Sequence, residues 1–227
     1  MSRSQQGLAG AGEWETLRKL LPDFKDKRVL DLGCGYGWHC IYAMEHGASS
    51  VVGVDISHKM LEVAKEKTHF PQVEYKCCAI EDVEFPEESF DVILSSLAFH
   101  YVADYEILVK KIYRILKSGG KLVFTVEHPV FTAYGTQDWY YNEKGEILHF
   151  PVDNYYYEGK RTAVFLGEKV TKYHRTLTTY LNTLLSNGFI INHIVEPQPP
   201  EYMMDIPGMQ DEMRRPMMLL VKARKPV

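Results

Sequence analysis

The sequence has no excess of positive charge, no long apolar run and few cysteines. Lys and Arg number 26 against 30 Asp and Glu, which gives a formal net charge of -4. A chain with this charge gains nothing from releasing the counterions of DNA or RNA, so we expect no nucleic-acid partner. No apolar stretch approaches the roughly 18 residues of a membrane span, and residues 1–6 lack the apolar core of a signal peptide. We therefore predict a soluble, cytoplasmic protein with no membrane partner.

The four cysteines are poorly spaced for a zinc site. They are Cys34, Cys40, Cys77 and Cys78, and no two of them form a Cys-x-x-Cys pair. The adjacent pair falls in a predicted strand, where neighbouring side chains point to opposite faces. We predict reduced thiols and no metal.

Most of the chain alternates between helical and strand patterns, as in a parallel α/β sheet. Apolar residues at helical spacing predict helices at 14–21, 38–46, 57–64, 104–116 and 177–185. Short apolar runs predict strands at 29–32, 51–55, 73–78, 91–95, 121–126, 189–196 and 217–223. No helical crossover separates the last two strands, so we expect them to pair antiparallel.

Residues 128–174 interrupt this alternation and hold seven of the 15 tyrosines. They show no strong helical or strand period, and a structureless loop of this length is unusual. We therefore predict one domain over residues 1–227, into which residues 128–174 are inserted as a lid or substrate subdomain with its own turns and short strands.

A glycine-rich turn at residues 33–37, Gly-Cys-Gly-Tyr-Gly, ends the first predicted strand and leads into a helix. Glycines let the backbone approach a ligand closely, and a helix N-terminus presents N–H groups to an anion or carboxylate. Asp55 ends the second predicted strand, where a carboxylate can accept both hydroxyls of a ribose. The combination indicates a nucleotide-like ligand.

Two ligands fit this arrangement, a dinucleotide and S-adenosylmethionine. The dinucleotide fingerprint has a third glycine at position 38, where this chain has Trp38. Asp31, two residues before the first glycine, would attract the ammonium of a methionine moiety and repel a pyrophosphate. These residues favour S-adenosylmethionine over NAD.

Four motifs follow one another within residues 25–126: 31–37, 52–57 with Met60, 87–92 and 116–120. Together they resemble a class I S-adenosylmethionine-dependent methyltransferase, of the small-molecule branch that includes the ubiquinone and menaquinone C-methyltransferases. The resemblance implies a Rossmann-like, doubly wound, mostly parallel sheet of seven strands with an antiparallel C-terminal hairpin. It also implies an enzyme that uses S-adenosyl-L-methionine to methylate a small organic acceptor by in-line displacement.

The resemblance also implies which residues bind the cofactor. Glycines of the turn would pack under the methionine and ribose, Asp55 would hold the ribose diol, and residues after three other strands would contact the adenine or the methionine. The full set is Asp31, Gly33, Cys34, Gly35, Gly37, Asp55, Ile56, Met60, Ile80, Glu81, Ser96 and Leu97. The family often has Asp where this chain has Ala79, so the backbone near Ile80 or the Glu81 side chain would supply that adenine contact.

Structural roles remain open for several of these residues. The glycines could form only a tight turn, Asp55 could cap a helix, and Cys34 could be only a small residue in the turn. Ile56 and Met60 could be ordinary core residues.

The acceptor should approach from the carboxyl ends of the strands. The fourth and fifth predicted strands bring His100, Tyr101, Glu127 and His128 to that end. His128 is the first candidate for a general base and His100 the second, because imidazole titrates near neutral pH. A hydrogen-bonded structural histidine ahead of Pro129 is the alternative for His128.

Aromatic residues of the insert, such as Trp139 and Tyr155 to Tyr157, could line an apolar acceptor pocket and face the sulfonium, or form a homodimer surface or a small core. Arg3 or Trp14 could fold over the cofactor. Two other functions are left open: a non-catalytic S-adenosylmethionine-binding sensor or partner module, and an NAD-dependent oxidoreductase.

Overall fold

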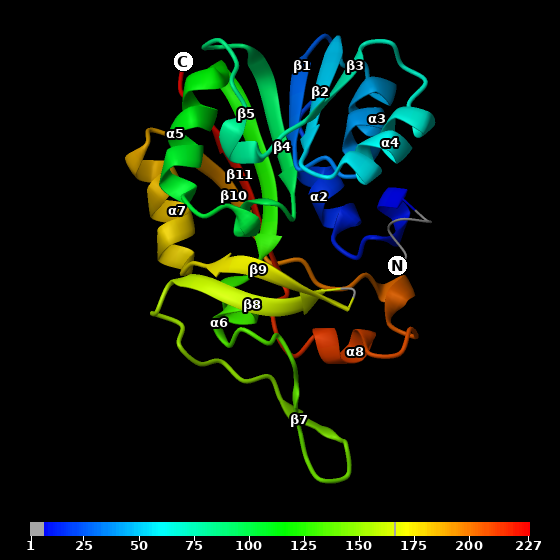
Figure 1. Ribbon diagram of the computed structural model, residues 1–227, viewed down its shortest axis with the longest axis vertical. Helices are drawn as coiled ribbons and strands as arrows, with labels where there is room; N and C mark the ends of the chain where they lie inside the picture. Colours follow the sequence, from blue (N-terminus) through cyan, green and yellow to red (C-terminus); the bar gives the residue numbers. More distant parts are fainter. Residues whose placement is uncertain (1–6, 166) are drawn as a thin grey trace.

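A seven-stranded sheet forms the centre of the computed structural model, which describes residues 7–165 and 167–227 (Figure 1). The strand order is β10-β11-β5-β4-β1-β2-β3, and within this sheet β11 runs antiparallel to both of its neighbours. The strands are β1 (Arg28–Leu32), β2 (Ser50–Asp55), β3 (Val73–Cys77), β4 (Phe90–Ser96), β5 (Leu116–Glu127), β10 (Ile190–Val195) and β11 (Met218–Arg224). The predicted mostly parallel sheet with an antiparallel C-terminal hairpin is confirmed.

Helices cover both faces of the sheet. They are α2 (Trp14–Leu20), α3 (Trp38–Glu45), α4 (His58–Lys67), α5 (Tyr105–Ile115) and α7 (Leu177–Ser186). Leu17, Cys40 and Leu61 place α2, α3 and α4 in one buried hydrophobic cluster. Ile112 and Leu184 place α5 and α7 in the other. Each fully buried aliphatic side chain stabilises the fold by about 1.5–3 kcal/mol. The two buried clusters therefore hold helices against both faces of the sheet, which is the doubly wound arrangement.

The predicted helix starts at Ser57 and Asp104 are confirmed by their caps. The Ser57 hydroxyl accepts the N–H of Met60 at 3.3 Å, and the Asp104 carboxylate accepts the N–H of Ile107 at 2.9 Å. These caps satisfy N–H groups that have no partner inside the helix, each for about 1 kcal/mol.

The fifth strand begins earlier than the sequence predicts. The Ser-Gly-Gly at residues 118–120 predicts a turn between the helix and a strand at 121–126, yet β5 starts at Leu116. Gly119 has a φ of +75°, and the pairing with β4 shifts register between Phe90 and Val92. The glycines therefore form an irregularity within the strand, which propensity alone does not distinguish from a turn.

The insert contains a short helix and two hairpins. They are formed by α6 (Pro129–Ala133), β6 (Tyr140–Tyr141) with β7 (Ile147–His149), and β8 (Gly159–Phe165) with β9 (Glu168–His174). In Figure 1 the β8–β9 hairpin crosses below the carboxyl ends of the sheet strands, and the β6–β7 hairpin projects away from the body. The strand period of β9 was not visible in the sequence, because its buried positions hold the polar residues Lys172 and His174.

Shorter elements complete the chain: the 3-10 helices η1 (Gly7–Gly10), η2 (Ile80–Asp82), η3 (Phe99–Tyr101) and η4 (Glu201–Met203), and the helix α8 (Met209–Glu212). The link between β10 and β11 packs on the insert, where Arg215 lies 4.5 Å from the ring centre of Phe131 and 4.8 Å from that of Trp139. None of the helices in the described ranges is both long and apolar enough to cross a membrane.

Candidate functional site

The glycine turn after β1 is folded against the ends of β2 and β4. Gly33 has a φ of +79°, and a Cβ there would lie 2.3 Å from the Cβ of Ala98, just beyond β4. The N–H groups of Gly33 and Cys34 both donate to the carbonyl of Val54, at 2.8 and 2.9 Å. A larger side chain at Gly33 would push the turn away from both strands.

The turn ends at Gly37, the residue before α3. A Cβ on Gly37 would lie 2.2 Å from the hydroxyl of Tyr75, so this position also requires glycine. The indole of Trp38 follows, with Lys67 Nζ 4.7 Å from its ring centre. A large side chain therefore fills the position at which a dinucleotide fingerprint has its third glycine.

Asp55, at the end of β2, connects the glycine turn to α4. Its Oδ2 accepts the N–H of Gly35 and its Oδ1 accepts the N–H of Ser57, both at 2.8 Å. A carboxylate can accept about four hydrogen bonds, so two positions remain for hydroxyl donors. The carboxylate is thereby held in one orientation at the strand end, as a ribose-binding residue requires.

Beside Asp55 lies an exposed apolar residue, Ile56. Its side chain is 75% exposed, so it does not belong to the core. Met60 is half-buried next to the glycine turn, Ile80 is buried, and Glu81 is exposed. An apolar surface left open next to a fixed carboxylate fits a flat heterocycle such as adenine.

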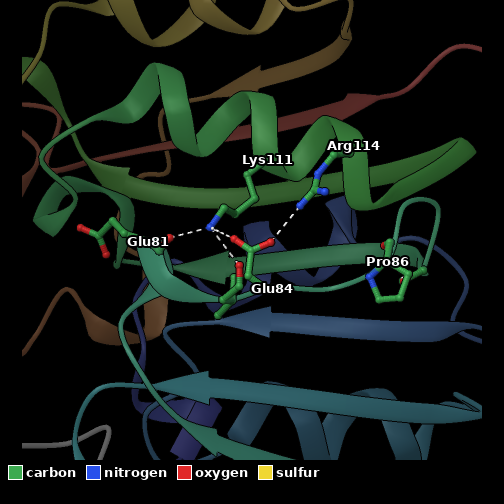
Figure 2. Close-up of polar contacts among 7 residues, drawn as sticks. Glu81, Glu84, Pro86, Lys111 and Arg114 are labelled. Atoms are coloured by element: carbon green, nitrogen blue, oxygen red, sulfur yellow. Dashed lines mark hydrogen bonds and ion pairs between the residues drawn. The ribbon is translucent and has the colours of Figure 1, made fainter.

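The segment after β3, which includes Ile80 and Glu81, is held in place from α5 (Figure 2). Lys111 Nζ donates to the backbone carbonyls of Glu81 at 2.6 Å and Val83 at 2.9 Å, and to the Glu84 carboxylate at 2.9 Å. Figure 2 shows Lys111 and Arg114 reaching from α5 to the two oxygens of Glu84. Lys111 therefore fixes the predicted adenine loop without being part of it.

Replacing Lys111 by methionine is expected to weaken binding of S-adenosylhomocysteine about threefold to tenfold. The change keeps the aliphatic stem and removes three hydrogen bonds, so the loop after β3 loses its fixed position. Lys110→Met is the matched control, because Lys110 sits on the same helix and pairs only with exposed Glu106 among the contacts of the described chain. Isothermal titration calorimetry checks the prediction, and equal affinities of the two variants would contradict it.

Asp31 is fully buried in β1 below the glycine turn. Cys40 Sγ donates to its Oδ2 at 3.5 Å, while Oδ1 has no hydrogen-bond partner within the described ranges. Burial is the main cause that raises the pKa of this carboxyl to about 7, and the nearby charge of Asp55 adds to it. A buried oxygen without a partner leaves Asp31 unsatisfied in the protein alone, which fits the predicted contact with the cofactor ammonium.

The predicted methionine contacts lie at the junction of β4 and β5. Leu97 has a φ of +54°, and its N–H donates to the backbone carbonyl of Thr125 at 2.9 Å and to the Thr125 hydroxyl at 3.0 Å. Ser96 Oγ lies 3.3 Å from the same hydroxyl. The chain is therefore held in a left-handed conformation where it leaves β4, which is typical of functional sites.

Both predicted histidines are buried at this end of the sheet. His100 Nδ1 accepts the N–H of Glu127 at 3.3 Å, and burial lowers the pKa of His100 to about 4. Its position depends on Arg175, which donates to the carbonyls of Val102 and Ala103 and so ties η3 to the end of β9. His100 is therefore neutral at physiological pH and acts as an acceptor.

His128 has neighbours at both ring nitrogens. Nδ1 accepts the N–H of Val130 at 3.1 Å, which caps α6, and Nε2 lies 2.8 Å from Oε1 of Glu196. Burial lowers the pKa of the imidazole, and Glu196 opposes that effect. These contacts favour the structural role that the sequence left open, and its role as a base stays a prediction.

His128→Ala is expected to lower the free energy of unfolding by about 1–2 kcal/mol, the usual effect of losing an N-cap. His128→Asn should restore part of this loss, because asparagine also caps helices. Urea denaturation of the two variants and the wild type measures the effect. If all three proteins have the same stability, the ring has no structural role and the base interpretation gains support.

Sequence reasoning missed two polar residues of the insert. Lys172 Nζ donates to Glu127 Oε1 at 2.5 Å and to Gln137 Oε1 at 2.9 Å, and Gln137 Nε2 donates to Glu127 Oε2 at 2.7 Å. The three side chains form a closed ring of hydrogen bonds between the end of β5 and the insert. We call it the Glu127 ring. Lys172 lies 45 residues from Glu127 and 35 from Gln137, and only the polar residues in a strand could have indicated the contact.

Of the two N-terminal candidates, Arg3 lies outside the described residues. Trp14 is buried, with its ring centre 4.9 Å from that of Tyr42. It therefore packs α2 against α3.

Known proteins are similar to this chain in both sequence and fold. A family model described as a methyltransferase domain matches residues 30–124. The crystal structure of a Listeria monocytogenes protein assigned to the S-adenosylmethionine-dependent methyltransferases is 58% identical, covers 97% of this chain and 100% of its own, and has a TM-score of 0.93. An S-adenosylmethionine-dependent methyltransferase from Mesorhizobium loti is 41% identical, covers 96% of this chain and 100% of its own, and has a TM-score of 0.89.

This chain belongs to the S-adenosylmethionine-dependent methyltransferases. It is therefore an enzyme whose cofactor is S-adenosylmethionine, as the sequence predicts, and this function is favoured over an NAD-dependent oxidoreductase and a non-catalytic binding module. The methyltransferase is also 36% identical over 112 residues to a protein of Coxiella burnetii named "Ubiquinone biosynthesis O-methyltransferase". That match covers 48% of this chain and 47% of the relative, so the shared part is about half of each protein.

Proposed function

We propose that the methyltransferase binds its cofactor across the carboxyl ends of β1, β2 and β4 and transfers the methyl group to a small organic acceptor. The observation that carries this proposal is the Asp55 carboxylate, fixed between the N–H groups of Gly35 and Ser57 and next to exposed Ile56. Asp55 holds the ribose hydroxyls, and Ile56 and Met60 flank the adenine. The turn at Gly33 supports the methionine portion.

The remaining predicted residues complete the cofactor site in this proposal. Ile80 and Glu81 present the edge that receives the adenine, and Lys111 holds them there. Asp31 balances the charge of the ammonium from below the turn, while Ser96 and Leu97 contact the methionine chain. When bound, S-adenosylmethionine supplies an electrophilic methyl on a sulfonium, and the protein's main contribution is alignment and exclusion of water.

The net charge of the chain and the name of a relative both support a small acceptor. The net charge of -4 offers no attraction to nucleic acids. The relative from Coxiella burnetii bears the name of an O-methyltransferase of ubiquinone biosynthesis. The β8–β9 hairpin crosses the end of the sheet at which the acceptor would enter (Figure 1). The insert therefore forms the acceptor side of the site in this proposal.

The second candidate role of the insert is a homodimer surface. Tyr156 and Tyr157 are 87% and 74% exposed, and Tyr140 in the projecting hairpin is 55% exposed. Exposed aromatic residues are enriched at protein interfaces. Sedimentation analysis of the wild type and of a variant that combines Tyr140→Ser, Tyr156→Ser and Tyr157→Ser separates a dimer from a monomer.

The experiment that tests the proposed function is transfer of label into a metabolite extract. The protein is incubated with the extract and S-adenosylmethionine carrying a labelled methyl group, and labelled products are identified by mass spectrometry. We expect formation of S-adenosylhomocysteine and of one labelled small molecule, both abolished in Asp55→Ala. Cofactor binding without any S-adenosylhomocysteine would favour the non-catalytic sensor instead.

A further inference from the structure

The Glu127 ring lies next to the methyl end of the proposed cofactor site. Glu127 stands two residues beyond Thr125 in β5, so the two side chains share one face of the strand. Thr125 contacts Ser96 and Leu97, the residues that the proposed function places on the methionine chain. The carboxylate of Glu127 therefore continues that face toward the acceptor side.

Glu127 and Gln137 are the half-buried members of the ring, and Lys172 is its buried member. Among the paired side chains, Lys172 is 3% exposed and Glu127 is 15% exposed. Two of the roughly four acceptor positions on the carboxylate are used, by Lys172 and Gln137. A molecule that enters beside the insert thus meets a carboxylate with acceptor positions left.

Attachment of the insert to the sheet does not require the ion pair between Lys172 and Glu127. Burying two charges costs several kcal/mol of hydration, which an apolar contact at the same place would not. Arg175 already ties β9 to η3, and Arg215 already packs on the aromatic side chains of the insert. The charges of the Glu127 ring are therefore better explained by a ligand than by the attachment of the insert.

We propose that Glu127 is a catalytic residue that receives the acceptor, and that the acceptor's reacting atom is a nitrogen or oxygen bearing a hydrogen. This inference rests on the proposed function. The N–H or O–H donates to the carboxylate, which orients the lone pair toward the methyl carbon. As the lone pair forms the new bond, the carbon–sulfur bonding pair stays with sulfur, and the proton passes to Glu127 and then to water. Lys172 and Gln137 hold the carboxylate in position, and His100 fixes its backbone.

Two cofactor analogues test this inference without the acceptor. Sinefungin places a protonated amine at the position of the transferred methyl, whereas S-adenosylhomocysteine has no group there. A carboxylate facing this position favours sinefungin. We therefore expect Glu127→Gln to lower the ratio of the sinefungin affinity to the S-adenosylhomocysteine affinity about tenfold, which is the effect of one charge-assisted hydrogen bond. Lys172→Met should raise the ratio, because the carboxylate then lacks its counter-charge. Glu146→Gln, on the exposed side of the insert, should leave the ratio unchanged.

The ratio separates a catalytic carboxylate from a structural one. If the Glu127 ring only holds the insert in place, its loss should affect the affinity for both ligands alike. Equal loss of both affinities in Glu127→Gln, with an unchanged ratio, would therefore overturn the inference. An unchanged or lowered ratio in Lys172→Met would overturn it independently, even if Glu127→Gln does not fold. If the wild type binds neither analogue, the proposed function itself fails. Calorimetry supplies both affinities.

Discussion

Asp55→Ala is expected to weaken binding of S-adenosylmethionine at least tenfold. Hydrogen bonds to a charged group are worth roughly 1.5–3 kcal/mol, and the proposed contact with the ribose involves two hydroxyls. The variant also frees the N–H groups of Gly35 and Ser57, which both donate to this carboxylate at 2.8 Å. The glycine turn and the start of α4 therefore lose their common anchor, and this loss of preorganisation adds to the loss of the ribose contact.

A control must separate these effects from general destabilisation. Asp104 also accepts a backbone N–H at the start of a helix, at 2.9 Å, but at the N-terminus of α5, two turns before Lys111. Asp104→Ala should therefore lose similar stability and bind the cofactor normally. Asp55→Asn should fall between the wild type and Asp55→Ala, because the amide keeps one acceptor oxygen. Calorimetry well below the unfolding temperature gives the affinities, and an unchanged affinity in Asp55→Ala would remove Asp55 from the ribose site.

Local signals in the sequence were sufficient to predict the sheet and the glycine turn. Gly33 and Gly37 need glycine because a Cβ at either position would lie within 2.3 Å of a neighbouring side chain, and such turns have a recognisable composition. Ser57 and Asp104 each accept the N–H of the residue three positions later, so their role as caps can also be predicted from the local sequence. Asp55 follows from its place at a strand end.

The acceptor side could not be predicted in the same way. Glu127 and Lys172 are 45 residues apart, and their contact depends on how the β8–β9 hairpin crosses the sheet. The polar residue Lys172 occupies a buried strand position, which removes the apolar alternation that identifies strands. Lys111 reaches the adenine loop across about 30 residues, and nothing in its own helix indicates this. Long-range polar contacts of this kind become visible only in the folded chain.

Asp31→Asn is expected to stabilise the cofactor-free methyltransferase at pH 8 relative to the wild type, and to do so much less at pH 4. Burial holds the pKa of Asp31 near 7 in the folded protein, whereas the unfolded chain has the ordinary value of 3.8. Between these values the folded state keeps a proton that the unfolded state has lost. Stability from this group is therefore fully present below the unfolded value and falls as the pH rises to about 7. At pH 8 the wild type has lost on the order of 4 kcal/mol in this way.

Asp91 provides a control with the opposite sign. Its carboxylate accepts bonds from Lys117 and from the N–H of Arg28, and these lower its pKa. Asp91→Asn should therefore reduce stability at pH 4, 6 and 8, because the carboxyl stays ionised in the folded protein at all three values, and the loss should diminish only below the ordinary value of 3.8. Urea denaturation at pH 4, 6 and 8 gives the difference between each variant and the wild type, in which the titration of all other groups cancels.

Asp31→Asn should also weaken binding of the cofactor. This links the carboxyl that destabilises the fold to its function. If the ammonium of S-adenosylmethionine is balanced by Asp31, only the ionised carboxyl contributes, so the affinity of the wild type should rise as the pH increases from 6 to 8. Asp31→Asn should bind more weakly and show a flatter dependence on pH in calorimetry. A variant that gains stability at pH 8 and keeps the wild-type affinity would separate Asp31 from the cofactor. The expected pair of results, higher stability with weaker binding, would instead mean that the buried acid is kept at the expense of the fold because the cofactor requires it.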